Sequence, residues 1–263
     1  MNEFIRKILS TKTGSVSIDV FDPWHIAYII LIIGGGIALS VYYKNKPTEV
    51  KTKFLNILAI ALPCVYILDF FLMPLAGTGY SGYIDKLPFH ICTFMSIWVP
   101  FAQFNKKFEK VKDVICCLTL VASLMYITYP GSALGDILPW SYKVIQTFVF
   151  HGLMFIWSLV SIATDMIQLD IRKIWKEAVA LAGMTAWALI GNYMFDNWDG
   201  EGGGYDWFFV KGGLIGIDET PWGPFVMPLL VFIAIFAMCA IIHGLNICLR
   251  KIFTTENSEY KTA

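Results

Sequence analysis

Seven stretches of this chain are apolar over roughly the 20 residues that a helix needs to cross a bilayer. Backbone polar groups in lipid must be satisfied within the segment, so such stretches form helices. The composition agrees, with 57% hydrophobic and 15% charged residues and a mean hydropathy of +0.62. The sequence therefore predicts an all-α polytopic membrane protein with about seven transmembrane helices, the third and fourth being short enough to leave six or eight open. The expected spans are 24–43, 54–75, 88–104, 114–129, 143–164, 174–195 and 224–249.

Lysine and arginine set the orientation, because loops rich in these residues stay in the cytoplasm. Alternate linkers and the C-terminal tail hold most of them: Lys44, Lys46, Lys51, Lys53, Lys106, Lys107, Lys110, Lys112, Arg172, Lys173, Lys176, Arg250, Lys251 and Lys261. We expect the N-terminus outside and the C-terminus inside, although Arg6, Lys7 and Lys12 oppose this. The chain then divides into a tail (1–23), one membrane domain (24–249) and a cytoplasmic tail (250–263). The prediction is a multi-pass protein of the cell membrane with lipids as its partners.

Several function classes are disfavoured by the same sequence. A formal net charge of +0 gives no basic face for nucleic acid. The glycine-rich stretch 200–204 lacks the lysine, strand and helix of a phosphate loop, so no cofactor is expected. Trp207, Phe208 and Phe209 follow it. We expect these aromatic side chains in an outer loop at the membrane interface, with a lid over a site as the alternative.

Polar residues inside the spans fall at one depth below the outer face. At about 1.5 Å per residue, Cys92 and Thr93 lie roughly 6–8 Å in, Asp69 roughly 9 Å and His151 roughly 12 Å. His90 belongs to the same layer. Titratable groups at such depth are kept for a function or a partner. Three further residues join them as candidate substrate-binding groups: His25, Asn192 and Tyr193. His243 falls near the opposite face and is expected to pack there.

This layer holds the parts of a covalent ester-cleaving site. His151 is the natural general base, and Thr93 or Cys92 the nucleophile, because a thiol or hydroxyl attacks well only beside a base. His90 would hold the acyl carbonyl, and Asp69 would orient a histidine or pair with His25 or Lys86. His90 and Cys92 are roughly 200° apart on a helix, so they share a pocket only where the first turn is irregular.

Two other function classes use the same residues. A small-solute transporter or binding protein would bind substrate or relay protons with them, although no internal repeat supports it. A metal-dependent seven-helix hydrolase would take His90, His151, His25 and Asp69 as ligands. It ranks last because no His-x-x-x-His pair sets two ligands on one helix face, and no metal is predicted.

Two short motifs carry a family resemblance. Leu-Pro-Phe-His-Ile-Cys-Thr at 87–93 and Gln-Thr-Phe-Val-Phe-His-Gly at 146–152 resemble the YwaF-like family of bacterial integral membrane proteins. That family is similar to a eukaryotic transmembrane acyltransferase that remodels ether phosphatidylethanolamine. The resemblance implies a lipid acyltransferase and matches Pro88, His90, Thr93 and His151.

One position departs from that pattern. The proposed nucleophilic cysteine of the eukaryotic enzymes falls on Phe89, and Cys92 is only a neighbour. Thr93-Phe94 also resembles the Thr-Phe dipeptide of androgen-induced membrane lipid hydrolases, in which the threonine is the nucleophile. Together the residues and the resemblance predict a lipid acyltransferase or acyl-ester hydrolase with a Thr/Cys–His site near the outer leaflet.

Overall fold

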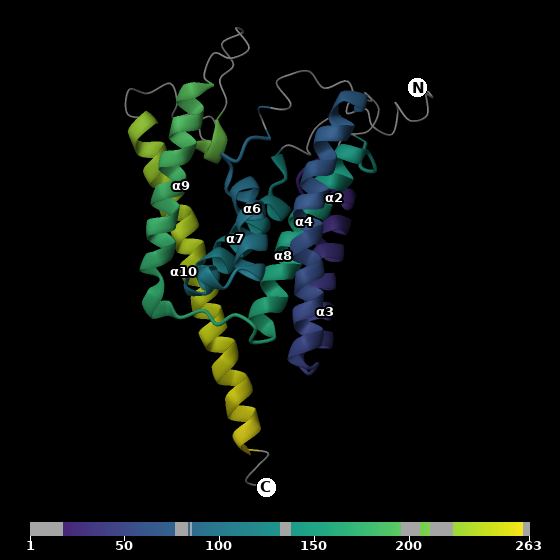
Figure 1. Cartoon of the computed structure of the whole chain (residues 1–263), viewed down its shortest axis with the longest axis vertical. Helices are drawn as coiled ribbons and strands as arrows, with labels where there is room; N and C mark the ends of the chain where they lie inside the picture. Colours follow the sequence, from purple (N-terminus) through teal and green to yellow (C-terminus); the bar gives the residue numbers. More distant parts are fainter. Residues whose placement is uncertain are drawn as a thin grey trace.

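The computed structural model describes residues 18–76, 84, 86–131, 138–195, 206–210 and 223–259, and its long elements are all helices. Figure 1 shows them packed side by side along one axis. The long helices are α2 (Pro23–Ile29) with α3 (Gly35–Lys44), α4 (Thr48–Ala76), α6 (Ile91–Phe104), α7 (Lys112–Thr128), α8 (Tyr142–Ala163), α9 (Trp175–Met194) and α10 (Gly223–Glu259). Short elements are the π-helical turn η1 (Ile30–Gly34) and the 3₁₀ turns η2 (Lys106–Val111), η4 (Ile171–Lys173) and η5 (Trp207–Phe209).

Five of these helical segments are long and apolar enough to cross a membrane. They are Pro23–Lys44, Thr48–Leu72, Lys106–Thr128, Tyr142–Ala163 and Phe225–Cys248. α6 is shorter, with 14 residues, and α9 has 20 but is not among the five. Each of the seven predicted spans coincides with a helix, which confirms the polytopic all-helical class. The seventh extends ten residues beyond its expected end, from 249 to Glu259.

α7 and α8 form the centre of the bundle. Their spans are 61% and 67% buried, against 17–28% for the other three long spans. A polar chain crosses this core: Trp157 Nε1 donates to Gln103 Oε1 at 3.3 Å, and Gln103 Nε2 donates to Asn56 Oδ1 at 2.7 Å. Hydrogen bonds between helices replace the water that lipid cannot supply, so α4, α6 and α8 are held in register.

Close helix contact depends on one glycine of α3. A Cβ at Gly36 would come 2.7 Å from the Phe155 ring of α8, so only glycine fits without a shift. Asp22 begins the first span by accepting from the His25 backbone N–H at 2.7 Å, with Pro23 in the first turn. The π-helical turn η1 separates this start from α3.

The basic linkers gather at one end of the bundle. Lys51 Nζ donates to the Thr164 carbonyl at 3.3 Å, and Lys176 Nζ donates to the Lys110 carbonyl at 2.9 Å. The Arg250 guanidinium pairs with Asp165 at 2.5 Å. α2 begins at the other end of the bundle and α10 finishes beyond the basic end (Figure 1). A single basic end is what the N-out, C-in prediction requires.

Thiol labelling tests the orientation. In a background without Cys64 and Cys248, the exposed native thiols, we expect a cysteine at Gly131 to react with an impermeant maleimide from outside. A cysteine at Lys107 should react only after the membrane is opened, because its linker lies at the basic end. Reaction of both from the same side would contradict the topology.

Candidate functional site

His151 of α8 uses only one of its two ring nitrogens in a hydrogen bond within the described structure. Its side chain is 6% exposed, and the ring stacks on Tyr126 of α7 at 3.7 Å with planes 4° apart. Nδ1 lies 2.8 Å from the Thr147 carbonyl oxygen. A carbonyl only accepts, so Nδ1 carries the hydrogen of the neutral ring and Nε2 keeps its lone pair. Nε2 is buried and has no hydrogen-bond partner among the described residues.

His90 holds the opposite tautomer. Its Nδ1 accepts the Phe208 backbone N–H at 3.3 Å, so the hydrogen of the neutral ring is on Nε2. His90 is the N-cap of α6, with extended backbone (φ −82°, ψ 149°). The chain is therefore not helical at His90, and the 200° separation from Cys92 that a regular helix would impose does not apply.

The two candidate nucleophiles lie in the first turn of α6. Thr93 Oγ1 donates to the His90 carbonyl at 2.9 Å, and its side chain is 9% exposed. Cys92 Sγ is 3.9 Å from the Ala122 carbonyl of α7, one helical turn before the Tyr126 that covers His151. No hydrogen bond joins either residue to His151 in the described structure, so both remain candidates.

Asp69 pairs with Lys86, one of the two partners that the sequence allowed. Its carboxylate is 2.6 Å from Lys86 Nζ and is 7% exposed. The Thr147 carbonyl and the Phe208 N–H, rather than Asp69, hold the two histidine rings.

The three predicted substrate-binding residues have different surroundings. His25 is fully buried, and both ring nitrogens bond to backbone: Nδ1 accepts from Phe21 N at 2.9 Å, and Nε2 lies 2.8 Å from the Ile127 oxygen. Tyr193 is 88% exposed on α9. Asn192 is buried, and its amide makes two hydrogen bonds to the Trp207 backbone, at 2.8 and 3.0 Å. A substrate-binding role for these residues stays a prediction from sequence.

Asn192 thereby fixes the segment 206–210 against the bundle. Trp207 and Phe208 are 1% and 3% exposed, and only Phe209, at 44%, faces outward. The Trp207 ring packs on Phe89 at 4.8 Å. The expectation that all three aromatic residues rest at the interface was therefore wrong, because the Asn192 amide satisfies the backbone of the segment and lets it enter the core. The Phe208 backbone N–H donates to His90 Nδ1, so the segment 206–210 lies against the His90 side of the candidate site.

Phe208 and Phe209 have left-handed backbone, with φ of 67° and 54°. Bulky residues rarely adopt this conformation, which stores strain and concentrates at functional segments.

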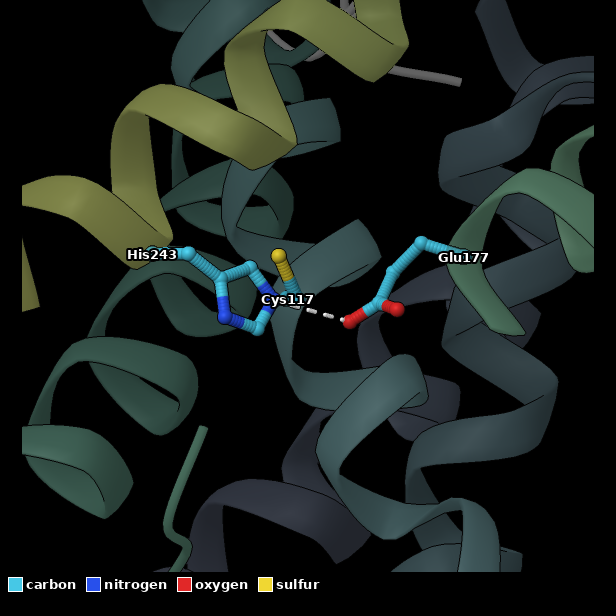
Figure 2. Close-up of side chains that lie close together, drawn as sticks. All are labelled: Cys117, Glu177 and His243. Atoms are coloured by element: carbon cyan, nitrogen blue, oxygen red, sulfur yellow. Dashed lines mark hydrogen bonds and ion pairs between the residues drawn. The ribbon is translucent and has the colours of Figure 1, made fainter. Parts of the chain in front are cut away.

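A second buried group lies near the basic end of the bundle. Figure 2 shows Cys117 of α7, Glu177 of α9 and His243 of α10 converging. The sequence had predicted only packing for His243 and had not singled out Glu177. The four ligands expected for a metal hydrolase do not form such a group in the described structure, whereas these three residues do.

Two surface clefts also lie at the basic end. One surrounds Lys51 and Asp165, and the other surrounds Lys176 and Asp165. Neither cleft includes any of the predicted site residues.

Comparison with known families gives one match. The TMEM164 family model matches residues 20–243, which covers α2 through most of α10 and includes both polar groups. Searches of curated proteins and of solved structures give no match. Because the family model covers most of the 263 residues, this multi-pass membrane protein belongs to the TMEM164 family.

Proposed function

We propose that this protein cleaves or transfers the acyl esters of membrane lipids, with His151 as the general base. The observation that carries the proposal is the buried, unpartnered Nε2 of His151. Leaving a buried acceptor unsatisfied costs about 1–3 kcal/mol, so the position favours a group that brings a proton. A nucleophile or a substrate hydroxyl is such a group.

The two histidines support complementary roles. The Thr147 carbonyl keeps the His151 proton on Nδ1, so Nε2 is an acceptor aimed away from α8 backbone. The Phe208 N–H keeps the His90 proton on Nε2, which is a donor. A neutral donor can stabilise the oxyanion that develops on an ester carbonyl. His90 is therefore assigned to the carbonyl oxygen and His151 to proton transfer.

The proposed reaction balances as an ordinary acyl transfer. Nε2 of His151 takes the proton of Thr93 Oγ1 or Cys92 Sγ while that atom bonds to the acyl carbon. The ester C–O bond breaks, and His151 returns the proton to the leaving lipid alcohol. A second alcohol then takes the acyl group in transfer, or water takes it in hydrolysis.

The resemblance to an ether phosphatidylethanolamine acyltransferase supports the same reading. It rests on Pro88, His90 and Thr93, at and just before the start of α6, and on His151 in the middle of α8. Under the proposed topology this site faces the outer leaflet of the cell membrane. The Asp69–Lys86 pair would bind a polar headgroup beside it.

The Asp69–Lys86 pair, whose carboxylate is buried, also favours a second candidate, a small-solute transporter. Charged pairs within membrane bundles often mark ion or substrate paths. In cells lacking the protein, an unchanged lipid profile together with altered uptake of a small solute would favour the transporter.

Two substitutions test the acyl-transfer proposal and separate the nucleophiles. Thr93→Val removes the oxygen and keeps the branched shape, and Cys92→Ser replaces the thiol by a poorly reactive hydroxyl. We expect one of them to abolish acyl transfer or hydrolysis, with Thr93 favoured by its match to both resembling families. The measurement is mass spectrometry of phospholipid acyl chains after incubation of the protein in liposomes. Full activity of both folded variants would show that α6 supplies no covalent nucleophile.

A further inference from the structure

Cys117, Glu177 and His243 bring three different donor types together from three helices. Glu177 is 2% exposed, His243 is 1% exposed and Cys117 is fully buried. His243 Nε2 lies 3.1 Å from Glu177 Oε1, and one donor atom of each of the three residues lies within 4.8 Å of the others. Figure 2 shows the thiol, the imidazole and the carboxylate directed toward one another.

One donor in this group has no partner. Glu177 Oε2 is buried and makes no hydrogen bond among the described residues. A carboxylate oxygen accepts but cannot donate, so only a proton donor or a cation can satisfy it. The neighbouring thiol offers a lone pair, and the imidazole offers one once the Nε2 hydrogen that faces Glu177 Oε1 has moved to Nδ1. A cation would then satisfy all three groups at once.

We propose that Cys117, Glu177 and His243 bind a Zn²⁺ ion. Zinc in proteins takes sulfur, imidazole nitrogen and carboxylate oxygen at about 2.0–2.3 Å in tetrahedral arrangement, which places donor atoms about 3.3–3.6 Å apart. The separations here are 3.1 Å and less than 4.8 Å, so the donors close on the ion by side-chain rotation. The mixed thiolate, imidazole and carboxylate set favours zinc over magnesium or calcium, which take oxygen ligands.

Charge balance supports the assignment. Binding releases the proton of the Cys117 thiol and moves the hydrogen of the neutral His243 ring from Nε2, where it faces Glu177 Oε1, to Nδ1. One thiolate and one carboxylate then neutralise the two charges of the ion. A neutral cluster suits a position inside the bundle better than an unbalanced carboxylate does.

A second thiol borders the group. Cys239 precedes His243 by one turn on the same face of α10 and is a neighbour of Cys117. Its sulfur is not one of the donor atoms that meet in the group, so the three proposed ligands are Cys117, Glu177 and His243.

The position gives the ion a structural role. α9 and α10 contact each other and α7, whereas α10 is only 17% buried over its apolar span. An ion held by one residue of each helix would fasten α9 and α10 to the central helix α7. The group lies near the basic end, where the predicted topology places the cytoplasm.

Metal content is the first test. The full chain, purified through a tag that does not bind metal and dialysed against metal-free buffer, should contain about one zinc per chain by plasma mass spectrometry. Replacement by cobalt should give the near-ultraviolet absorption of a thiolate-to-cobalt bond. Folded protein with neither bound zinc nor this absorption after metal loading would overturn the proposal.

Neighbouring cysteines supply matched variants. Cys117→Ser should lose the cobalt–thiolate absorption and the zinc. Cys116→Ser should keep both, because Cys116 is equally buried but its thiol faces the Ser158 carbonyl of α8 at 3.6 Å. Equal loss or equal retention of metal in the two variants would contradict the assignment.

Removing the metal from the wild-type protein with a chelator tests the structural role without relying on variants that could fail to fold. A strong chelator should lower the thermal midpoint, and zinc but not magnesium should restore it. An unchanged midpoint after the zinc is removed would overturn the structural role.

Discussion

Replacement of His151 by glutamine is expected to lower acyl-ester turnover by about 10²–10⁴-fold, the usual contribution of a positioned general base. A glutamine amide can still donate to the Thr147 carbonyl, so the loss would report chemistry and not the lost hydrogen bond. The measurement is the rate of acyl-chain exchange or release in liposomes of defined phospholipids.

Tyr126→Phe is the control for this variant. It keeps the ring that stacks on His151 and removes only the hydroxyl, so packing around the histidine is preserved. Its turnover should stay close to that of the wild type. Equal activity of His151→Gln and the wild type, with both proteins folded, would contradict the proposed base.

Truncation of Trp207 is expected to destabilise the protein by about 3–5 kcal/mol, as for other buried tryptophans replaced by alanine. The side chain is 1% exposed and packs on Phe89, and its backbone is held by Asn192. The free energy of unfolding can be measured by titrating the bicelle-embedded protein with a denaturing detergent.

Phe209→Ala is the matched change, because Phe209 lies in the same turn η5 but is 44% exposed. It should alter the unfolding free energy far less. Similar values for both variants would show that the segment 206–210 does not pack in the core.

The helix framework could be predicted because its signal is local. Each apolar stretch carries its own length and composition, and the basic linkers mark one end without reference to the rest of the chain. The prediction that His90 and His151 share a layer depended only on counting residues from the ends of two spans. That they form one site stays a prediction.

The ring orientations could not be predicted in the same way. The Thr147 carbonyl is a backbone group, and its bond to His151 depends on a rotamer that composition does not fix. Pro88 weakly indicated that a helix begins nearby, and α6 does begin at Ile91. Proline commonly stands just before or within the first turn of a helix. That signal did not say where the His90 ring would point.

The residues of the proposed zinc site were missed because they are distant in sequence. Glu177 and His243 are 66 positions apart, and no spacing rule joins them. One local sign was present: Glu177 is a carboxylate in the first turn of an apolar helix.

The inward packing of Trp207 and Phe208 bears on which acceptor completes the proposed reaction. An acyl group attached to α6 partitions between water and a second lipid alcohol according to their relative access to its carbonyl. Two buried aromatic side chains, Trp207 and Phe208, lie on the His90 side, where they would hinder the approach of bulk water. Under the proposed acyl transfer, this geometry is expected to shift the product ratio toward the remodelled lipid and away from free fatty acid, with residues 206–210 as the part of the chain that sets that ratio.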